Sequence, residues 1–120
     1  RLDVFVSGAG VCERPNLPIT MWQSQNATAS VVTVTVTGAV AVDDANRRAP
    51  PAALTEPGAN RYVLFVSTEP IPDSLARPCD GDGHVPYEAV LVFPQDSLSD
   101  FHLTVVHDGE TVVTWGNESV

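Results

Sequence analysis

Hydrophobic and polar residues alternate along several stretches of this chain. In residues 2–7, LDVFVS, Leu2, Val4 and Val6 share one parity, whereas Phe5 takes the other. A period of two residues is typical of β-strands, because successive side chains point to opposite faces of the sheet. No stretch of ten residues shows the apolar period of a helix, so the pattern predicts an all-β fold.

The longest alternating stretch is residues 31–42, VVTVTVTGAVAV. Its valines share one parity, and the threonines share the other: Val32, Val34, Val36, Val40 and Val42 against Thr33, Thr35 and Thr37. Gly38 lies within this predicted strand, and a glycine at such a place often marks a bulge or bend. A tight turn at Gly38-Ala39 is the less favoured alternative, because the parity continues beyond it.

Five further stretches have the composition of strands: 18–24, 61–67, 87–93, 100–107 and 110–115. Two of them, 61–67 and 87–93, are apolar on both faces, which predicts central strands. The last two are separated by Asp108-Gly109. This dipeptide favours a type I′ hairpin turn, because both central residues of that turn need positive φ.

About seven short strands in 120 residues predict one domain, residues 1–120. The expected fold is an antiparallel two-sheet β-sandwich of immunoglobulin-like architecture with one disulfide. Two long connections remain, 43–60 and 68–86, and within the first, residues 51–58 would form one short helical turn at most. The immunoglobulin sequence pattern itself is absent, because Trp22 follows Cys12 by only ten residues.

The charge balance narrows the classes of partner. Fifteen acidic residues face six basic residues, all of them arginine, which gives a net charge of −9. Such a surface repels phosphate backbones and anionic lipid headgroups. The sequence therefore predicts no nucleic-acid partner, and no membrane insertion of the given chain, because polar residues interrupt its uncharged stretches.

Two cysteines and two glycosylation triplets indicate an extracellular or cell-surface location. Cys12 and Cys79 are the only cysteines, and we expect them to form a disulfide worth roughly 4 kcal/mol in the chain-entropy model. The alternative is two reduced, buried thiols in a cytosolic protein. Asn26 and Asn117 begin Asn-X-Thr and Asn-X-Ser triplets, which are N-glycosylation acceptors in secreted proteins.

The stretch CDGDGH contains the residues best suited to hold a metal ion. Asp80 and Asp82 have the spacing of the first two ligands of a calcium loop, with Glu88 as a third candidate. The remaining positions of an EF-hand loop do not fit. We therefore expect these aspartates to cap turns, and predict no cofactor, with calcium at Asp80 and Asp82 as the alternative.

Catalytic motifs are absent from the chain, so the sequence predicts no enzyme. There is no G-x-S-x-G elbow, no H-E-x-x-H and no phosphate-binding glycine loop. His102 and His107 lie five residues apart on one predicted strand, so they point to opposite faces and cannot share a metal ion. We expect His102 to face solvent and His107 to flank the turn. Four aromatic residues are expected to fill the core or a sheet end rather than form a binding platform: Trp22, Tyr62, Tyr87 and Trp115.

The N-terminal strand is the most suggestive functional feature. The strand is followed by the glycine-containing sequence SGAG, which could act as a hinge. A strand that is joined to its domain by a hinge could pair with its own sheet or with the sheet of a neighbouring molecule. The predicted strand-exchange residues are Leu2, Val4, Phe5, Val6, Gly8 and Gly10. The uncharged stretch 31–42 would then serve as the acceptor edge.

These features favour a non-enzymatic extracellular structural or interaction module. We expect its partner to be protein, by self-association, as in a subunit of a surface filament or coat. One alternative is a monomeric binding domain that uses the connections 43–60 and 68–86. A second alternative is a small metal-binding or hydrolytic protein centred on Asp80, Asp82 and His84.

Overall fold

The computed structural model describes residues 2–8, 10–12, 19–26 (the backbone alone for 22–26), 30–43, 46–72, 83–94 and 101–116. These residues form strands and no helix, which confirms the all-β prediction. The strands are β1 (Leu2–Ser7), β2 (Thr20–Asn26), β3 (Val31–Val42), β4 (Arg47–Arg48), β5 (Ala53–Gly58), β6 (Arg61–Val66), β7 (Glu69–Pro70), β8 (Gly83–Pro94), β9 (His102–His107) and β10 (Glu110–Gly116). The same residues contain no helix that is long and apolar enough to cross a membrane.

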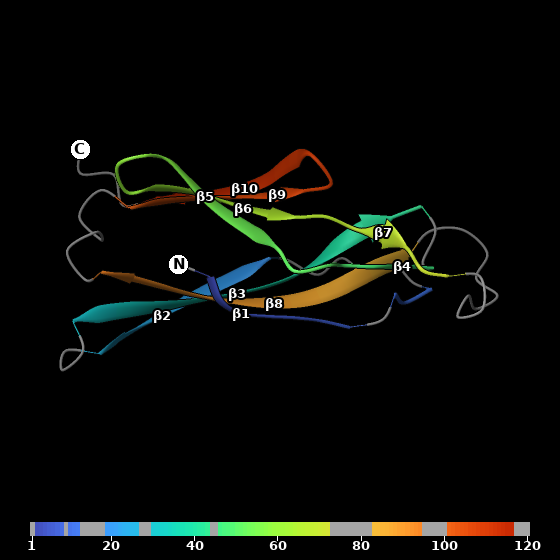
Figure 1. The fold of residues 1–120 in the computed structure, drawn as a ribbon, viewed down its shortest axis with the longest axis horizontal. Coiled ribbons are helices and arrows are strands. Elements are labelled where there is room, and N and C mark those ends of the chain that lie inside the picture. The colour runs from blue at the N-terminus through green and yellow to red at the C-terminus, as the bar shows by residue number, and fades with distance from the viewer. Residues whose placement is uncertain are drawn as a thin grey trace.

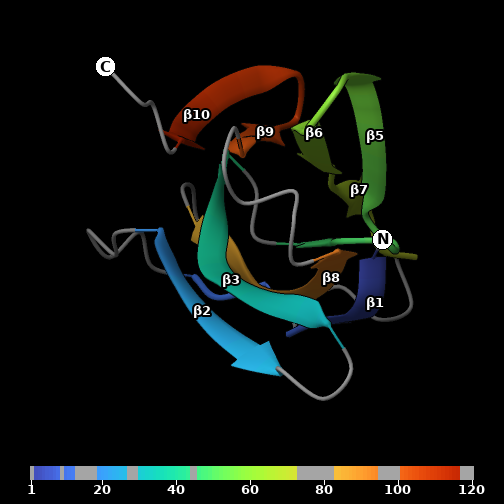
Figure 2. The ribbon, with the colours of Figure 1, turned by 90° about the vertical axis from the view of Figure 1, so that its left-hand side faces the viewer.

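Two four-stranded sheets lie one above the other (Figure 1). The first sheet has the order β1-β8-β3-β2, and the second has the order β10-β9-β6-β5. Figure 2 shows the same two layers from one end of the molecule. The short strands β4 and β7 pair at the opposite end, where the chain passes between the layers.

One strand pair departs from the expected antiparallel arrangement. All neighbours in the first sheet are antiparallel, but β6 and β9 of the second sheet run parallel. After β6 the chain leaves the second sheet and forms β8 in the first before it returns as β9. A connection of this kind allows the chain to re-enter a sheet in the same direction, which a hairpin cannot do.

The core lies between the two sheets and consists mainly of aliphatic and aromatic side chains. The predicted valine face of β3 is confirmed, since Val32, Val34 and Val36 are fully buried and Val40 and Val42 nearly so. Its neighbour β8 contributes Tyr87, Ala89, Leu91 and Phe93 to the same layer, and the facing strands contribute Leu64 and Val66 from β6 and Leu103 and Val105 from β9. Burial of this apolar surface is the main force that holds the layers together.

Gly38 does not form the predicted bulge. The pairing of β3 with β8 runs without a shift from Val31 opposite Pro94 to Val42 opposite Gly83. A Cβ atom at Gly38 would lie 3.0 Å from the hydroxyl of Tyr87 and 3.2 Å from Cγ1 of Ile19. The glycine is therefore explained by the close approach of the tyrosine ring, which lies opposite it on β8.

The alternation in β1 is interrupted, and this changes which residues face the core. The register of β1 against β8 shifts between Leu2 and Val4. Leu2 and Phe5 consequently both pack against the core, whereas Val4 and Val6 are 45% and 60% exposed. The alternation of the sequence predicted that Leu2, Val4 and Val6 lie on the same face of the sheet. This prediction was wrong, because an irregularity of one residue turns the side chains of all later residues of the strand to the opposite face.

The two long connections contain strands that the sequence did not predict. Residues 51–58 include β5, which pairs with β6 through Leu54 and Leu64, and do not form a helical turn. Pro57 lies in β5, and a proline is tolerated there because β5 is an edge strand. The turn from β5 to β6 has Asn60 at φ 59°, a conformation that asparagine adopts more readily than most residues.

The predicted hairpin between β9 and β10 is confirmed. Asp108 and Gly109 have φ values of 48° and 85°, the positive values that a type I′ turn needs. His102 and His107 lie at opposite ends of β9 on opposite faces, as predicted, with His107 buried next to the turn. Tyr62, Tyr87 and Trp115 belong to the core or pack against it, while the side chain of Trp22 lies outside the described part of the structure.

Candidate functional site

The predicted exchange strand lies at the edge of the first sheet. β1 pairs antiparallel with β8 of the same chain, from Leu2 opposite Leu91 to Ser7 opposite Tyr87. Within the described residues, no strand pairs with its other side. The predicted acceptor, β3, is not an edge, because β2 and β8 pair with it on both sides. The strand that would lose its partner if β1 left is therefore β8, and the prediction that 31–42 is the acceptor edge was wrong.

The glycine segment after β1 continues along β8. The amide of Gly8 donates to the carbonyl of Pro86 at 2.9 Å, and Val11 and His84 exchange two backbone hydrogen bonds of 2.8 and 3.0 Å. A Cβ atom at Gly8 would lie 2.9 Å from Cγ of Pro86, so only glycine fits without a shift. Gly10 is buried. In this structure the segment therefore acts as a closely packed extension of β1.

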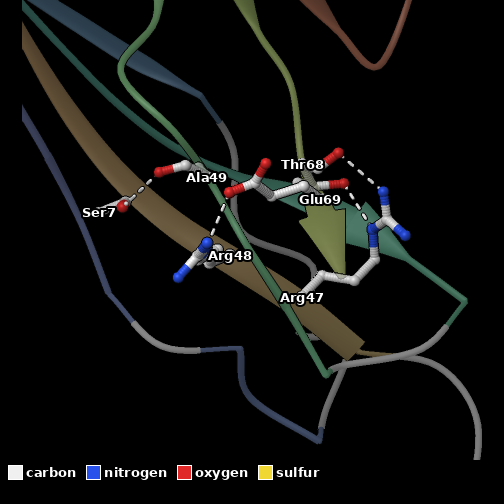
Figure 3. A network of polar contacts seen from close by, with 6 residues as sticks. All are labelled: Ser7, Arg47, Arg48, Ala49, Thr68 and Glu69. Carbon is white, nitrogen blue, oxygen red and sulfur yellow. Dashed lines mark hydrogen bonds and ion pairs between the residues drawn. The ribbon is translucent and has the colours of Figure 1, made fainter. Parts of the chain in front are cut away.

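Two side chains fasten β1 to the rest of the domain. The ring of Phe5 stacks on Tyr87 with centroids 5.9 Å apart. Ser7 Oγ donates to the carbonyl oxygen of Ala49 at 3.0 Å, which ties the end of β1 to the segment after β4 (Figure 3). Val4 and Val6 point away from the core and are exposed, so two of the four apolar side chains of this edge strand face solvent.

The remaining predicted site residues lie mostly outside the described residues. Cys79, Asp80, Asp82 and Asn117 belong to that group, so the calcium alternative stays a prediction. Cys12 is described and is not a free thiol, but the bridge to Cys79 stays a prediction as well. The backbone of Asn26 ends β2. Among the described residues, no three His, Cys, Asp or Glu side chains come close enough to hold a metal ion.

A buried polar pair joins the two sheets. The hydroxyl of Tyr87 on β8 and Nε2 of His107 on β9 share a hydrogen bond of 2.6 Å, and the two rings meet edge to face. Burial lowers the pKa of His107 to about 4, an effect that the neighbouring Asp108 carboxylate partly opposes. Burial also raises the pKa of Tyr87 well above its usual value. Both groups are therefore neutral at pH 7, and each serves as the other's hydrogen-bond partner.

A second polar cluster lies beside this pair and connects three chain segments. Both carboxylate oxygens of Asp108 accept hydrogen bonds from Thr68, one from its amide at 2.7 Å and one from its hydroxyl at 2.8 Å. The guanidinium of Arg47 donates to the hydroxyl and the carbonyl oxygen of Thr68, each at 2.7 Å (Figure 3). Thr68 thus bonds to a cation, Arg47, and to an anion, Asp108. These bonds hold β4 against the β9–β10 turn.

A hollow of about 260 Å³ opens at this cluster, lined by Ala41, Val42, Asp43, Arg47 and Asp108. The sequence did not predict the cluster, although it identified Asp108 as a turn residue. Thr68 lies 40 residues from Asp108 and 21 from Arg47, and no periodic pattern connects positions so far apart. The hollow is small and polar, and its charged side chains are largely committed to the contacts described above.

The two regions offer different kinds of function. The buried groups of the polar cluster bind one another, which suits a structural role. The β1 edge instead has exposed valines and, among the described strands, no neighbour on its outer side, which suits contact with another chain. No protein-family model matches this chain, and no curated protein or solved structure shows significant similarity to it.

Proposed function

We propose that this chain is a non-enzymatic interaction module of an extracellular or cell-surface assembly, and that β1 is its element of association. The observation that supports this most is the position of β1. In the part of the chain that the structure describes, it is an edge strand that pairs with β8 alone, and it exposes Val4 and Val6 to solvent. Unprotected edges of this kind tend to pair with other chains unless something covers them.

Exchange of β1 between copies would preserve every contact that the strand makes within one chain. The partners are identical residues in the acceptor copy: Leu91, Val90, Ala89, Glu88 and Tyr87 of β8. Phe5 would stack on Tyr87 of the acceptor in the same way. The closed and exchanged forms then differ in free energy mainly because the segment after β1 takes a different conformation in each. The balance between them also depends on the concentration of chains, as is usual for strand exchange.

The proposal includes the finer features predicted for the fold and the location. We propose that the two sheets form a variant immunoglobulin-like sandwich, and that a Cys12–Cys79 disulfide fastens the chain just after the exchanged segment. The net charge of −9 would keep such an assembly soluble. Asn26 and Asn117 remain the proposed glycosylation positions.

A crosslinking experiment tests whether β1 is exchanged. Val4 and Val90 are register partners, so the substitutions Val4→Cys and Val90→Cys place two thiols within disulfide reach. If β1 is exchanged, oxidation joins separate chains, and non-reducing electrophoresis shows dimers and longer ladders. If every bridge forms within one chain, strand exchange is excluded. The pair Thr33→Cys with Val92→Cys is the matched control, because β3 and β8 pair within one chain in both cases.

Truncation provides a second test of the same proposal. The intact chain should form oligomers or filaments in sedimentation and negative-stain microscopy, and a chain lacking residues 1–10 should not. Added peptide RLDVFVSGAG should restore assembly, whereas the same peptide carrying Phe5→Asp should not, because the acidic side chain cannot pack on Tyr87. An intact chain that is monomeric at all concentrations would contradict the proposal.

The second candidate function is a monomeric binding domain, favoured by the hollow lined by Asp43, Arg47 and Asp108. This hollow lies where the connection 43–60 begins, one of the two connections assigned to ligand contact. This candidate requires a stable monomer, so the sedimentation experiment separates it from the assembly proposal.

A further inference from the structure

A second hollow, at one end of the first sheet, is lined mainly by apolar residues. It has a volume of about 360 Å³, and its described lining consists of Ser30, Val31, Val92, Phe93 and Pro94. This volume lies near the lower end of the range for small-molecule sites, which is roughly 300–1,000 Å³. None of these five residues is charged, although the whole chain has a net charge of −9, so a neutral ligand suits the hollow better than an ion.

The register of the sheet places one of the proposed glycosylation positions beside this hollow. Asn26 is the last residue of β2 and pairs with Val31 of β3, and Val31 in turn pairs with Pro94 of β8. Directly opposed residues of antiparallel strands lie on the same face of a sheet, so positions 26, 31 and 94 form one row across three strands. Two members of this row line the hollow, and the third is the acceptor asparagine.

We infer that the hollow is the seat of the first sugars of a glycan attached to Asn26. Neighbouring strands lie about 4.8 Å apart, so position 31 is about 5 Å from position 26 along the row, and position 94 is about 10 Å away. A sugar ring spans roughly one such spacing, so a first sugar linked at position 26 reaches Val31, and a second reaches Pro94 and Val92. The inference rests on the glycosylation of Asn26, which belongs to the proposed function.

The chemistry of the attached sugar matches the hollow. In N-glycosylation the asparagine amide nitrogen bonds to C1 of a lipid-linked sugar phosphate. The nitrogen loses a proton, and the phosphate leaves with the electrons of the C1–O bond. The attached ring is uncharged and presents C–H groups on its faces and hydroxyl groups at its rim. The C–H groups can pack on valine and proline side chains while the hydroxyl groups stay in water, so contact removes apolar surface without burying unpaired polar groups.

A glycan in this hollow leaves the proposed element of association free. The sheet order β1-β8-β3-β2 puts position 26 on the edge strand opposite to β1 (Figure 2). Among the described strands, β2 pairs with β3 alone, so β2 is an edge that another chain could extend. A glycan at its last residue hinders such pairing. Of the two edges of the first sheet, β1 is then the one open to a partner.

Thermal unfolding with and without the sugar tests the inference. The variant Asn117→Gln keeps Asn26 as its acceptor, and an endoglycosidase trims the glycan of the secreted chain to one N-acetylglucosamine. We expect this single sugar to raise the melting temperature by about 4 °C relative to the same chain made in the bacterial periplasm without it. Val92→Ser should abolish the difference, because it removes apolar surface beneath the sugar. The matched control is Val63→Ser, at a half-buried valine of the second sheet, and it should keep the difference.

Nuclear Overhauser contacts between the ring protons of the sugar and the methyl groups of Val92 provide a readout that needs no variant. A glycosylated chain without these contacts would overturn the inference, as would an equal rise in melting temperature in Val92→Ser and Val63→Ser. An Asn26 that mass spectrometry shows to be unmodified would overturn it too. If Val92→Ser changes the sedimentation of the sugar-free chain, a second copy occupies the hollow and the inference also fails. Strand exchange is judged separately by the Val4–Val90 crosslink, which none of these results affects.

Discussion

The two ends of the core are built in different ways. At one end, Tyr62, Phe93 and Phe101 pack their rings together, with centroid separations of 4.4 to 5.8 Å. At the other end, Tyr87 and His107 meet through a hydrogen bond, next to the Arg47–Thr68–Asp108 cluster. The aromatic end is stabilised by burial of apolar area, which tolerates small displacements. The polar end is stabilised by directional bonds, each of which leaves a buried group unsatisfied when its partner is removed.

The difference between the two ends affects the proposed function, because the contacts that hold β1 lie at the polar end. Phe5 stacks on Tyr87, and Ser7 bonds to Ala49, next to the cluster. Disturbance of the aromatic end should therefore lower the stability of the whole domain, whereas disturbance of the polar end should also loosen β1. Four measurements, in decreasing order of the stability loss that we expect, separate these two outcomes.

Phe93→Ala should have the largest effect. The side chain is 1% exposed and contacts both Tyr62 and Phe101, so truncation leaves a cavity between the sheets. We expect a loss of about 3–5 kcal/mol in the free energy of unfolding, measured by urea denaturation. Phe65→Ala is the control: that ring is 42% exposed and should contribute far less. Equal losses in the two variants would show that the aromatic end is not packed as described.

Acidification should destabilise the polar end through His107. Its pKa is lowered to about 4 in the folded chain, below the value of about 6.5 for an unperturbed histidine. The unfolded chain therefore binds more protons between these values, so stability falls as the pH drops from 6.5 to 4 and then levels off. We expect a loss of about 2 kcal/mol over this window from this group, reduced from the ideal value by partial contact with solvent.

The variant His107→Gln isolates that effect. Fifteen acidic residues also titrate as the pH falls, so the relevant quantity is the difference between the pH profiles of the two chains. Unfolding free energies measured from pH 7 to pH 3.5 should fall more steeply in the unsubstituted chain. Parallel profiles would mean that the pKa of His107 in the folded chain is close to that of an ordinary histidine, and not lowered.

Asp108→Ala should cost about 1–2 kcal/mol, because it removes both acceptors of Thr68, whose amide is then buried without a partner. It also places alanine at a φ of 48°, which favours asparagine, aspartate or glycine. Asp108→Asn separates these contributions, since asparagine adopts the same backbone conformation and retains one acceptor. We expect it to lose less stability than Asp108→Ala in thermal unfolding. A loss as large in both would show that the charge and the second acceptor oxygen, and not the backbone conformation of the turn, make the dominant contribution.

The sequence predicted well those features that depend on local alternation. The valine face of β3 and the Asp108-Gly109 turn follow from residues close together in the chain. The facing of β1 was wrong because one irregularity between Leu2 and Val4 reversed it. Strand β5 was missed because Pro57 interrupts its pattern, and a proline is acceptable only at an edge, which the sequence does not show.

The polar end could not be predicted, because its contacts depend on the arrangement of distant segments. Tyr87 and His107 lie on strands of different sheets, 20 residues apart. The parallel pairing of β6 with β9 places the turn after β9 beside Thr68, and the sequence favoured an antiparallel arrangement instead. Arg47 and Thr68 meet because β4 pairs with β7, strands too short to leave a periodic signal.

Tyr87→Phe should have the smallest effect of the four, and it tests whether the bond between the sheets or the ring itself fastens β1. The phenyl ring can still stack on Phe5 and still fills the space left by Gly38, so only the bond to Nε2 of His107 is lost. We expect a loss of about 1 kcal/mol. The double variant with His107→Gln should lose less than the sum of the two single variants, because they remove the same bond. Amide hydrogen exchange at Val4 and Val6 should be unchanged in Tyr87→Phe if the ring is sufficient to hold β1. Faster exchange there would show that the polar bond, and not ring stacking, keeps the edge strand closed.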